Sequence, residues 1–136
     1  MATTSPSRSR SLPLRGVRIV SLALNLPGPA ALMRLRELGA RCLKVEPPGP
    51  GTTAAGRPIP GDPMGQYDVG AYTVMHEGIR IVTLNLKDEQ GRAQLAKELA
   101  VADVLLTSFR PSALAKLGLG WRRLHRSYPQ LSGVQI

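Results

Sequence analysis

The amino-acid sequence predicts an α/β fold with a doubly wound, mostly parallel sheet, because short apolar segments alternate with helix-like segments along the chain. The apolar segments lack the polar alternation of a half-exposed strand, which is typical of parallel strands buried on both faces. The 136 residues fit one domain, and a hydrophobic fraction of 43% is enough for a core of Leu, Val, Ile and Ala.

The first part of the chain contains the expected strand–helix–strand unit. Residues 1–13 are polar, lack periodicity and are expected to form a disordered leader. A continuous apolar run over residues 17–24 predicts a buried strand, and Pro29 in the turn after it suits the first position of a helix. That helix is expected to end at Gly39, because glycine readily takes the left-handed conformation found after helix ends. Residues 42–45 predict the second strand.

The second part of the chain continues the alternation. Residues 47–66 are rich in glycine and proline and predict an irregular loop, after which residues 68–75 predict a short helix. Residues 87–100 predict an amphipathic helix that Asp88 caps, with its leucines facing inward. The other expected elements are strands at residues 80–86, 104–107 and 131–136, a short helical stretch before residues 117–120, and a basic helix at residues 121–128.

The net charge of +9 is distributed unevenly along the chain. Residues 1–36 and 110–136 carry basic side chains and no acidic ones, whereas every acidic residue lies within residues 37–103. This distribution fits a polyanionic partner such as nucleic acid, a membrane surface or a nucleotide phosphate. It also fits a solvated leader and a helix whose acidic partners lie elsewhere. We favour the second interpretation and expect no nucleic-acid partner, because no aromatic interleaving or nucleic-acid motif accompanies the charge.

Residues that could bind a metal or form a disulfide are few. The single cysteine, Cys42, lies in an apolar run and is expected to be a buried, reduced thiol. The two histidines, His76 and His125, are expected to be surface or structural residues, and their wide spacing predicts no metal site. No apolar run approaches the ~20 residues that span a membrane, so no membrane partner and a cytoplasmic location are expected.

A glycine-rich segment at residues 49–56 invites comparison with nucleotide-binding loops. Its glycine spacing differs from the dinucleotide fingerprint, and it follows the second expected strand rather than the first. It also lacks the Gly-Lys-Ser/Thr of a P-loop. A plain mobile loop is therefore expected there.

Several segments together carry a family resemblance. Residues 103–111 read D-V-L-L-T-S-F-R-P and residues 117–120 read L-G-L-G, which is similar to the A-D-V-L-V-E-N-F-R-P-G…L-G-L-G signature of the family III CoA-transferases. That family includes formyl-CoA and carnitine CoA-transferases and α-methylacyl-CoA racemases. Four other segments resemble family motifs in the same order: residues 14–20 (L-R-G-V-R-I-V), 27–31 (P-G-P-A-A), 38–49 (L-G-A-R-C-L-K-V-E-P-P-G) and 83–87 (T-L-N-L-K).

The resemblance implies a fold, a substrate class and an assembly. Residues 14–136 would form an incomplete, Rossmann-like N-terminal half-domain that binds coenzyme A, and the parent enzyme would act on CoA thioesters as a transferase or racemase. Family members form interlocked homodimers. In the family, the catalytic aspartate, or the His/Asp pair of racemases, lies beyond the position that corresponds to residue 136. No catalytic residue is therefore expected here, and the chain alone is expected to be inactive.

The resemblance also implies which residues contact coenzyme A. Ser108, Phe109 and Arg110 lie where the family wraps the cofactor. Lys116 occupies a position where many members have a cofactor-binding arginine, and Arg80 follows a position where they have a CoA-binding lysine. A pyrophosphate and a 3′-phosphate need such cations. The plainer interpretation of the basic residues is surface charge on a loop and a helix.

One departure from the family pattern concerns the acyl group. Leu26 lies two residues before the glycine of the first turn, where formyl-CoA-type transferases have a glutamine that lines the acyl site. A leucine cannot hydrogen-bond an acyl-carboxylate intermediate, which favours a racemase-like or another acyl-CoA substrate. Two alternatives to an enzyme segment stay open: a free-standing CoA- or nucleotide-binding module, and a dimerisation module without catalysis.

Overall fold

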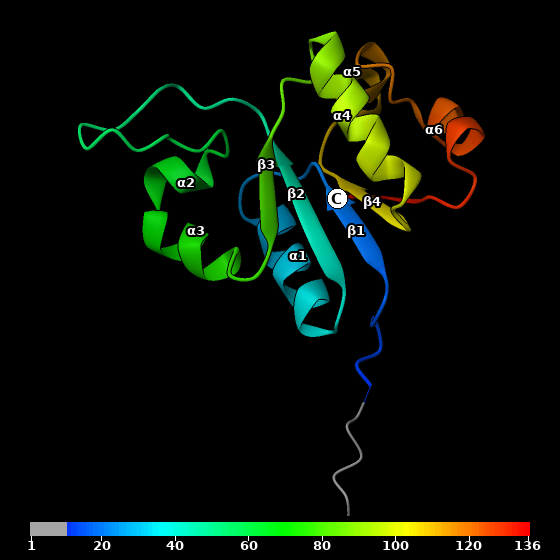
Figure 1. The fold of residues 1–136 in the computed structure, drawn as a ribbon, viewed down its shortest axis with the longest axis horizontal. Coiled ribbons are helices and arrows are strands. Elements are labelled where there is room, and N and C mark those ends of the chain that lie inside the picture. The colour runs from blue at the N-terminus through cyan, green and yellow to red at the C-terminus, as the bar shows by residue number, and fades with distance from the viewer. Residues whose placement is uncertain (1–10) are drawn as a thin grey trace, which may run out of the picture.

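The structure, a computed structural model, describes residues 11–136 and contains one five-stranded sheet with helices on both faces (Figure 1). The strands are β1 (Arg18–Ser21), β2 (Arg41–Glu46), β3 (Arg80–Thr83), β4 (Val104–Thr107) and β5 (Ser132–Gln135). The helices are α1 (Pro27–Glu37), α2 (Met64–Tyr67), α3 (Val69–Met75), α4 (Glu89–Ala100), α5 (Pro111–Lys116) and α6 (Trp121–Ser127). All strand pairs are parallel and the order is β3-β2-β1-β4-β5, which confirms the predicted doubly wound α/β fold.

Alternating residues of the buried strands supply two hydrophobic cores, one on each face of the sheet. Leu32 of α1 packs on one face, and Leu95 and Leu99 of α4 pack on the other, as predicted for α4. The α1 face also contains Ile19, Ala23, Ala40, Cys42, Ile79 and Leu106, whereas the α4 face contains Val20, Leu43, Val45, Leu105, Leu114 and Leu124 among others. Figure 1 shows α1 behind the sheet and α4 in front of it.

The buried thiol is confirmed. Cys42 lies in the core on the α1 face and is not part of a disulfide. Burial raises the pKa of this thiol to about 11, well above its ordinary value of 9.0. The side chain therefore behaves as a small apolar residue of the core at neutral pH.

The structure corrects several bounds of the predicted elements: β1 ends at Ser21 rather than at residue 24, and α4 begins at Glu89 rather than at residue 87. Helix α1 begins at Pro27 rather than at Pro29, since proline is suited to both places in a first turn that needs no N–H partners. The expected loop at residues 47–66 ends in a helical turn, α2. Strand β3 ends at Thr83 rather than at residue 86, because its partner β2 stops where Pro47 begins a segment without N–H donors.

Most of the expected leader lies outside the described residues. At its end, Arg15 N–H donates to Leu12 O at 3.1 Å, so residue 12 is part of a turn that leads into β1. Within residues 11–136, no helix has the length and apolarity needed to cross a bilayer.

The long segment between β2 and α2 forms a loop in which the residues that follow β2 contact the residues that precede α2. A Cβ on Gly61 would overlap Pro47 O, and a Cβ on Gly49 would overlap Ile59 O, so both close approaches require glycine. Nearer the tip, Ile59 N–H donates to Gly51 O at 2.9 Å. The closed base places the end of the loop, including Asp62, above β2.

Candidate functional site

The topology places a crevice between the loops that follow β1 and β4. These strands are neighbours, yet β1 leads to α1 on one face and β4 leads to α5 on the other. Ligands of open α/β sheets bind at such a switch point, outside the carboxyl ends of the strands. The two loops touch here, since Leu24 N–H donates to Ser108 Oγ at 3.4 Å.

The β4–α5 loop carries three of the expected cofactor-binding residues. Ser108 and Arg110 are exposed, and Phe109 is half-buried against the core of the α4 face. Thr107 Oγ1 accepts from Phe109 N–H at 3.0 Å and fixes the start of the loop. Lys116 is exposed at the last position of α5, the helix that Arg110 precedes. Sequence and topology thus bring Ser108, Phe109, Arg110 and Lys116 to one loop–helix unit.

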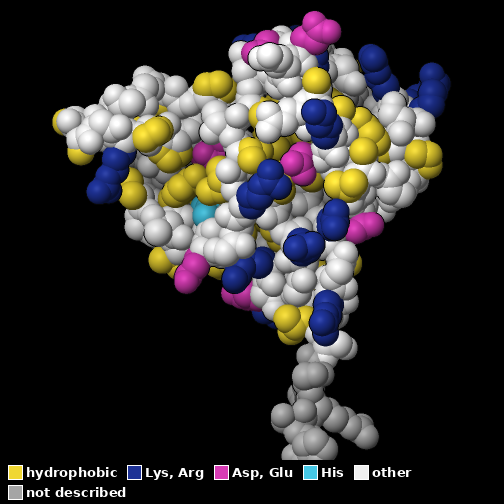
Figure 2. Space-filling model, in the orientation of Figure 1, with side chains coloured by type: hydrophobic (Ala, Val, Ile, Leu, Met, Phe, Trp, Pro, Cys, Tyr) yellow, Lys and Arg dark blue, Asp and Glu magenta, His cyan; other side chains and the backbone are white. Residues whose placement is uncertain are grey.

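Arg80 lies apart from that unit. It begins β3, which β2 and β1 separate from β4, and its Nη2 is 3.3 Å from Glu98 Oε1 of α4. It lines a depression of about 750 Å³ at the amino edge of the sheet, opposite the switch point, together with Arg18, Arg36, Arg41 and Glu98 among others. Figure 2 shows Lys and Arg side chains gathered over this part of the molecule. Basic side chains that are far apart in the sequence therefore lie close together at the amino ends of the strands, which the distribution of charge along the chain did not indicate.

The amino end of α1 offers few donors to an anion. Of its first three residues, Pro27 and Pro29 have no N–H, and Ala30 N–H already donates to Leu26 O at 3.0 Å. Gly28 therefore supplies the one free N–H of the first turn. A helix start that holds a pyrophosphate needs several such groups, so any phosphate at this crevice would depend on basic side chains instead.

Beneath the β1–α1 loop lies a group of ionisable residues, which we call the Lys44 cluster: the buried Lys44, Glu46, Asp62 and His76, and the half-buried Tyr72. Lys44 is fully buried, and its ammonium group hydrogen-bonds an Asp62 carboxylate oxygen and His76 Nε2, the latter at 2.7 Å. It also forms an ion pair with Glu46 Oε2 at 3.1 Å. Tyr72 O–H donates to the same Glu46 oxygen at 2.7 Å.

The hydrogen bonds fix the protonation of His76. Its Nδ1 lies 2.6 Å from the carbonyl oxygen of Tyr72, which can only accept, so Nδ1 carries the proton. Nε2 then accepts from Lys44. Burial, together with the nearby ammonium of Lys44, lowers the pKa of this imidazole below its ordinary value of 6.5, although the hydrogen bond to the Tyr72 carbonyl and the two carboxylates oppose the shift. His76 is therefore structural and neutral.

The phenol of Tyr72 responds to the same surroundings. Burial raises its pKa, and the hydrogen bond to the negatively charged Glu46 raises it further. Its ring lies 4.1 Å from the imidazole of His76, centroid to centroid. Tyr72 is therefore a protonated donor that connects α3 to β2.

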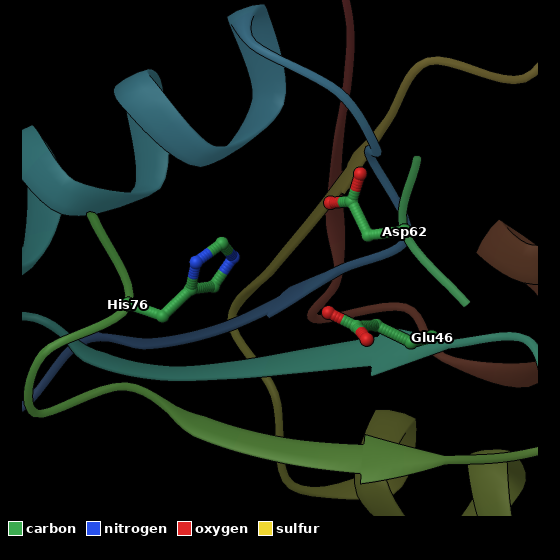
Figure 3. Close-up of side chains that lie close together, drawn as sticks. All are labelled: Glu46, Asp62 and His76. Carbon is green, nitrogen blue, oxygen red and sulfur yellow. The ribbon is translucent and has the colours of Figure 1, made fainter. Parts of the chain in front are cut away.

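Three members of the cluster have the side chains of a metal site. Figure 3 shows Glu46, Asp62 and His76 grouped above β2, and their ligand atoms lie within 4.8 Å of one another. Lys44 Nζ contacts all three side chains and supplies a positive charge among them. The donor set thus fits an internal cation, the ammonium of Lys44.

Sequence reasoning missed this cluster because it considered only cysteine and histidine as ligands. The available signal was the pair Lys44 and Glu46, two residues apart among the apolar residues Cys42, Leu43 and Val45. Side chains at that spacing share one face of the sheet. Two opposite charges on a buried face predict a local network of partners.

The cluster reaches the crevice through Asp62. One carboxylate oxygen, Oδ1, accepts from Asn25 N–H at 2.9 Å and from Met64 N–H at 3.0 Å. Asn25 has a φ of +67°, a left-handed conformation that asparagine tolerates better than most residues. Tyr67 O–H donates to Asn25 Oδ1 at 3.0 Å. The β1–α1 loop is therefore held from below by Asp62 and from the side by α2.

Comparisons with known proteins agree with one another. A family model described as CoA-transferase family III matches residues 14–136. The chain is 36% identical over 121 residues to the cinnamoyl-CoA:phenyllactate CoA-transferase of Clostridium sporogenes, which covers 89% of the chain and 29% of that enzyme. It is 35% identical over 132 residues to the acetyl-CoA:oxalate CoA-transferase of Acetobacter aceti, covering 96% of the chain and 32% of that enzyme.

Solved structures give the same result. A crystal structure of a hypothetical protein from Mycobacterium tuberculosis matches with a TM-score of 0.76 and 32% identity, covering 90% of this chain and 33% of that one. A CAIB/BAIF family protein from Brucella suis matches with a TM-score of 0.69 and 28% identity, covering 93% of this chain and 33% of that one. The chain thus spans about a third of the length of the relatives it matches.

Proposed function

The chain belongs to CoA-transferase family III, and from this premise we propose that it is the N-terminal CoA-thioester-binding segment of an acyl-CoA transferase or racemase. The observation that carries the proposal is the meeting of the β1–α1 and β4–α5 loops at the switch point, through Leu24 N–H and Ser108 Oγ. The relatives are named as enzymes that transfer CoA from cinnamoyl-CoA or acetyl-CoA. We further propose a cytoplasmic enzyme that works as a homodimer.

The proposed roles follow from the exposure and chemistry of each side chain. Arg110 and Lys116 would hold phosphate groups, because the first turn of α1 supplies one free N–H. Phe109 would offer an apolar surface to the ligand, and Ser108 a hydroxyl. Arg80 remains a proposed contact only for a ligand group that reaches the amino edge, where it is already paired with Glu98.

We propose that none of residues 11–136 acts as the catalytic acid. The charged members of the Lys44 cluster are buried and engaged with one another, so none faces the crevice as a free nucleophile. We therefore propose that the 136-residue chain alone binds CoA thioesters without converting them. Incubation with acetyl-CoA and free oxalate or phenyllactate should leave both unchanged; turnover above a heat-killed control would contradict this part of the proposal.

Calorimetric titration of the chain with CoA tests the binding site. Arg110→Ala should weaken binding about tenfold or more, since a charge-assisted bond to phosphate is lost. Arg15→Ala is a matched control, because Arg15 is equally exposed and lies before β1 at the opposite edge of the sheet. Equal affinity of the two variants would contradict the assignment of Arg110, and absence of CoA binding to the unaltered chain would contradict the proposed function.

A second role, self-association, is favoured by the exposure of β5. This strand is an edge of the sheet, all four of its residues are exposed, and Val134 is 46% exposed. The unpaired backbone N–H and C=O groups of an open edge strand can pair with another chain. Sedimentation velocity over a range of concentrations tests this role, and a single monomeric species at every concentration would contradict it.

A further inference from the structure

The Lys44 cluster contributes little net stability for the number of charged groups it buries, which suggests that it has a second role. Desolvation of a buried ion pair costs much of what the attraction returns, and apolar residues of similar volume often serve stability as well or better. Here four charged or titratable side chains, Lys44, Glu46, Asp62 and His76, are almost completely excluded from solvent. Every buried side-chain nitrogen and oxygen of the described residues nevertheless has a hydrogen-bond partner.

The geometry of the cluster shows what it holds in place. Asp62 stands at the centre of two sets of contacts: one carboxylate oxygen meets Lys44, and the other accepts the N–H groups of Asn25 and Met64. The contact with Lys44 fixes Asp62 to β2. The contact with Asn25 N–H then fixes the β1–α1 loop, which forms one wall of the crevice, to Asp62.

The β1–α1 loop needs such an anchor. Asn25 is the only non-glycine residue among residues 11–136 with a positive φ, and its side chain is exposed rather than packed. The N–H of its neighbour Leu24 donates to Ser108 Oγ at 3.4 Å. The conformation of the β1–α1 loop therefore sets its position relative to the β4–α5 loop across the crevice. Without the acceptor at Asp62, the left-handed conformation of Asn25 would lose its main backbone hydrogen bond.

We propose that Lys44 and Asp62 are positioning residues: the buried ion pair holds the β1–α1 loop at Asn25 in the conformation that shapes the CoA-thioester site. Neither residue touches the ligand. Lys44 fixes the carboxylate of Asp62, and Asp62 fixes the backbone of Asn25. The inference rests on the proposed function for its effect on binding, whereas its effect on the loop is independent of any ligand.

Asp62→Asn tests the proposal in the complete 136-residue chain. The amide is isosteric, but it weakens the contact with Lys44 and therefore loosens the hold on Asn25. We expect faster amide-proton exchange at Asn25 and Met64. We also expect the CoA dissociation constant to rise about tenfold, because a displaced β1–α1 loop no longer lies in the position that fits the ligand. Lys44→Met, which leaves Asp62 without its cation, should change the same two amides.

Leu95→Ala is the control for a merely structural role. Leu95 is fully buried on the α4 face with Leu43 and Val45, whereas Lys44 alternates with them in β2 and lies on the opposite face, so truncation of Leu95 should lower stability without changing the loop. At a temperature where both variants are folded, Leu95→Ala should bind CoA as the unaltered chain does. Equal loss of affinity in both variants would show that stability alone is responsible and would overturn the proposal.

The two readouts separate failure of the inference from failure of the proposed function. If the unaltered chain binds CoA, and Asp62→Asn binds it equally with unchanged exchange at Asn25, the positioning role is wrong. If no form of the chain binds CoA, the proposed function fails, while faster exchange at Asn25 in Asp62→Asn would still support the hold on the loop. Unchanged exchange at Asn25 overturns the inference in either case.

Discussion

Replacing Gly28 by alanine should destabilise the protein, because helix α1 and the end of the β1 segment approach each other too closely for a side chain. A Cβ at Gly28 would lie 2.8 Å from the carbonyl carbon of Ala23 and closer still to its Cβ. Ala23 is fully buried and cannot move aside without disturbing the core of the α1 face. The start of α1 would have to shift, and with it the β1–α1 loop.

The magnitude follows from two opposing effects. Overpacking of a buried site costs about 1–3 kcal/mol. Alanine is favoured over glycine in a helix by about 1 kcal/mol, and by less in a first turn. The overpacking is the larger effect, so we expect a net loss of about 1–2 kcal/mol. For a chain of this length that corresponds to a fall in Tm of roughly 3–10 °C.

Gly70→Ala is a closely matched control. Gly70 is the second residue of α3, as Gly28 is of α1, but its added Cβ would have only Asp68 Oδ1 nearby, at 3.7 Å. This variant should be as stable as the unaltered chain or slightly more stable. Thermal and urea unfolding followed by circular dichroism measures both. A Gly28→Ala variant that melts at or above the temperature of the unaltered chain would refute the steric argument.

Three further predictions concern single side chains. Asp88→Ala should lower the free energy of unfolding by about 1 kcal/mol in urea titrations, because the N-cap bond to Gly91 N–H, at 2.8 Å, is lost; an unchanged midpoint would contradict this. Cys42, with a pKa of about 11 against 9.0, should react with iodoacetamide at pH 8 roughly 100-fold more slowly than in the urea-unfolded chain, and equal rates would contradict its burial. His76 has a lowered pKa, so the unfolded state binds more protons and stability should fall as pH drops below 6.5. Urea midpoints at pH 7.5 and 5.5 should differ less in His76→Asn than in His125→Asn, in which the exposed imidazole is removed instead.

Much of the fold could be predicted because its signals are local. The apolar run at residues 104–107 became β4 without a change of boundary, and Asp88 caps α4 as predicted, although the helix begins at Glu89 rather than at residue 87. Strand order is different, since it depends on which apolar faces pack together and not on any one segment. The order β3-β2-β1-β4-β5 therefore came from the structure, although the family resemblance had implied its type.

The site was predictable only where it is contiguous in sequence. Ser108, Phe109 and Arg110 follow one strand, so the motif and the structure place them together. Asp62 and His76 reach Lys44 across separations of 18 and 32 residues, through a loop and a helix that have no periodic link to β2. Arg80 shows the opposite case, because it follows a CoA-binding position of the family in sequence but lies away from the crevice.

The closed loop between β2 and α2 is a place where residues can be inserted without disturbing the rest of the fold. The contacts of Gly49 with Ile59 and of Gly61 with Pro47 isolate the base of the loop from its exposed tip at residues 53–57. Extra residues at such a tip add little closure entropy, roughly 0.6 kcal/mol for each doubling of loop length. A fluorophore or an affinity tag could therefore be inserted at the tip while the base, and the residues that follow it, keep their positions.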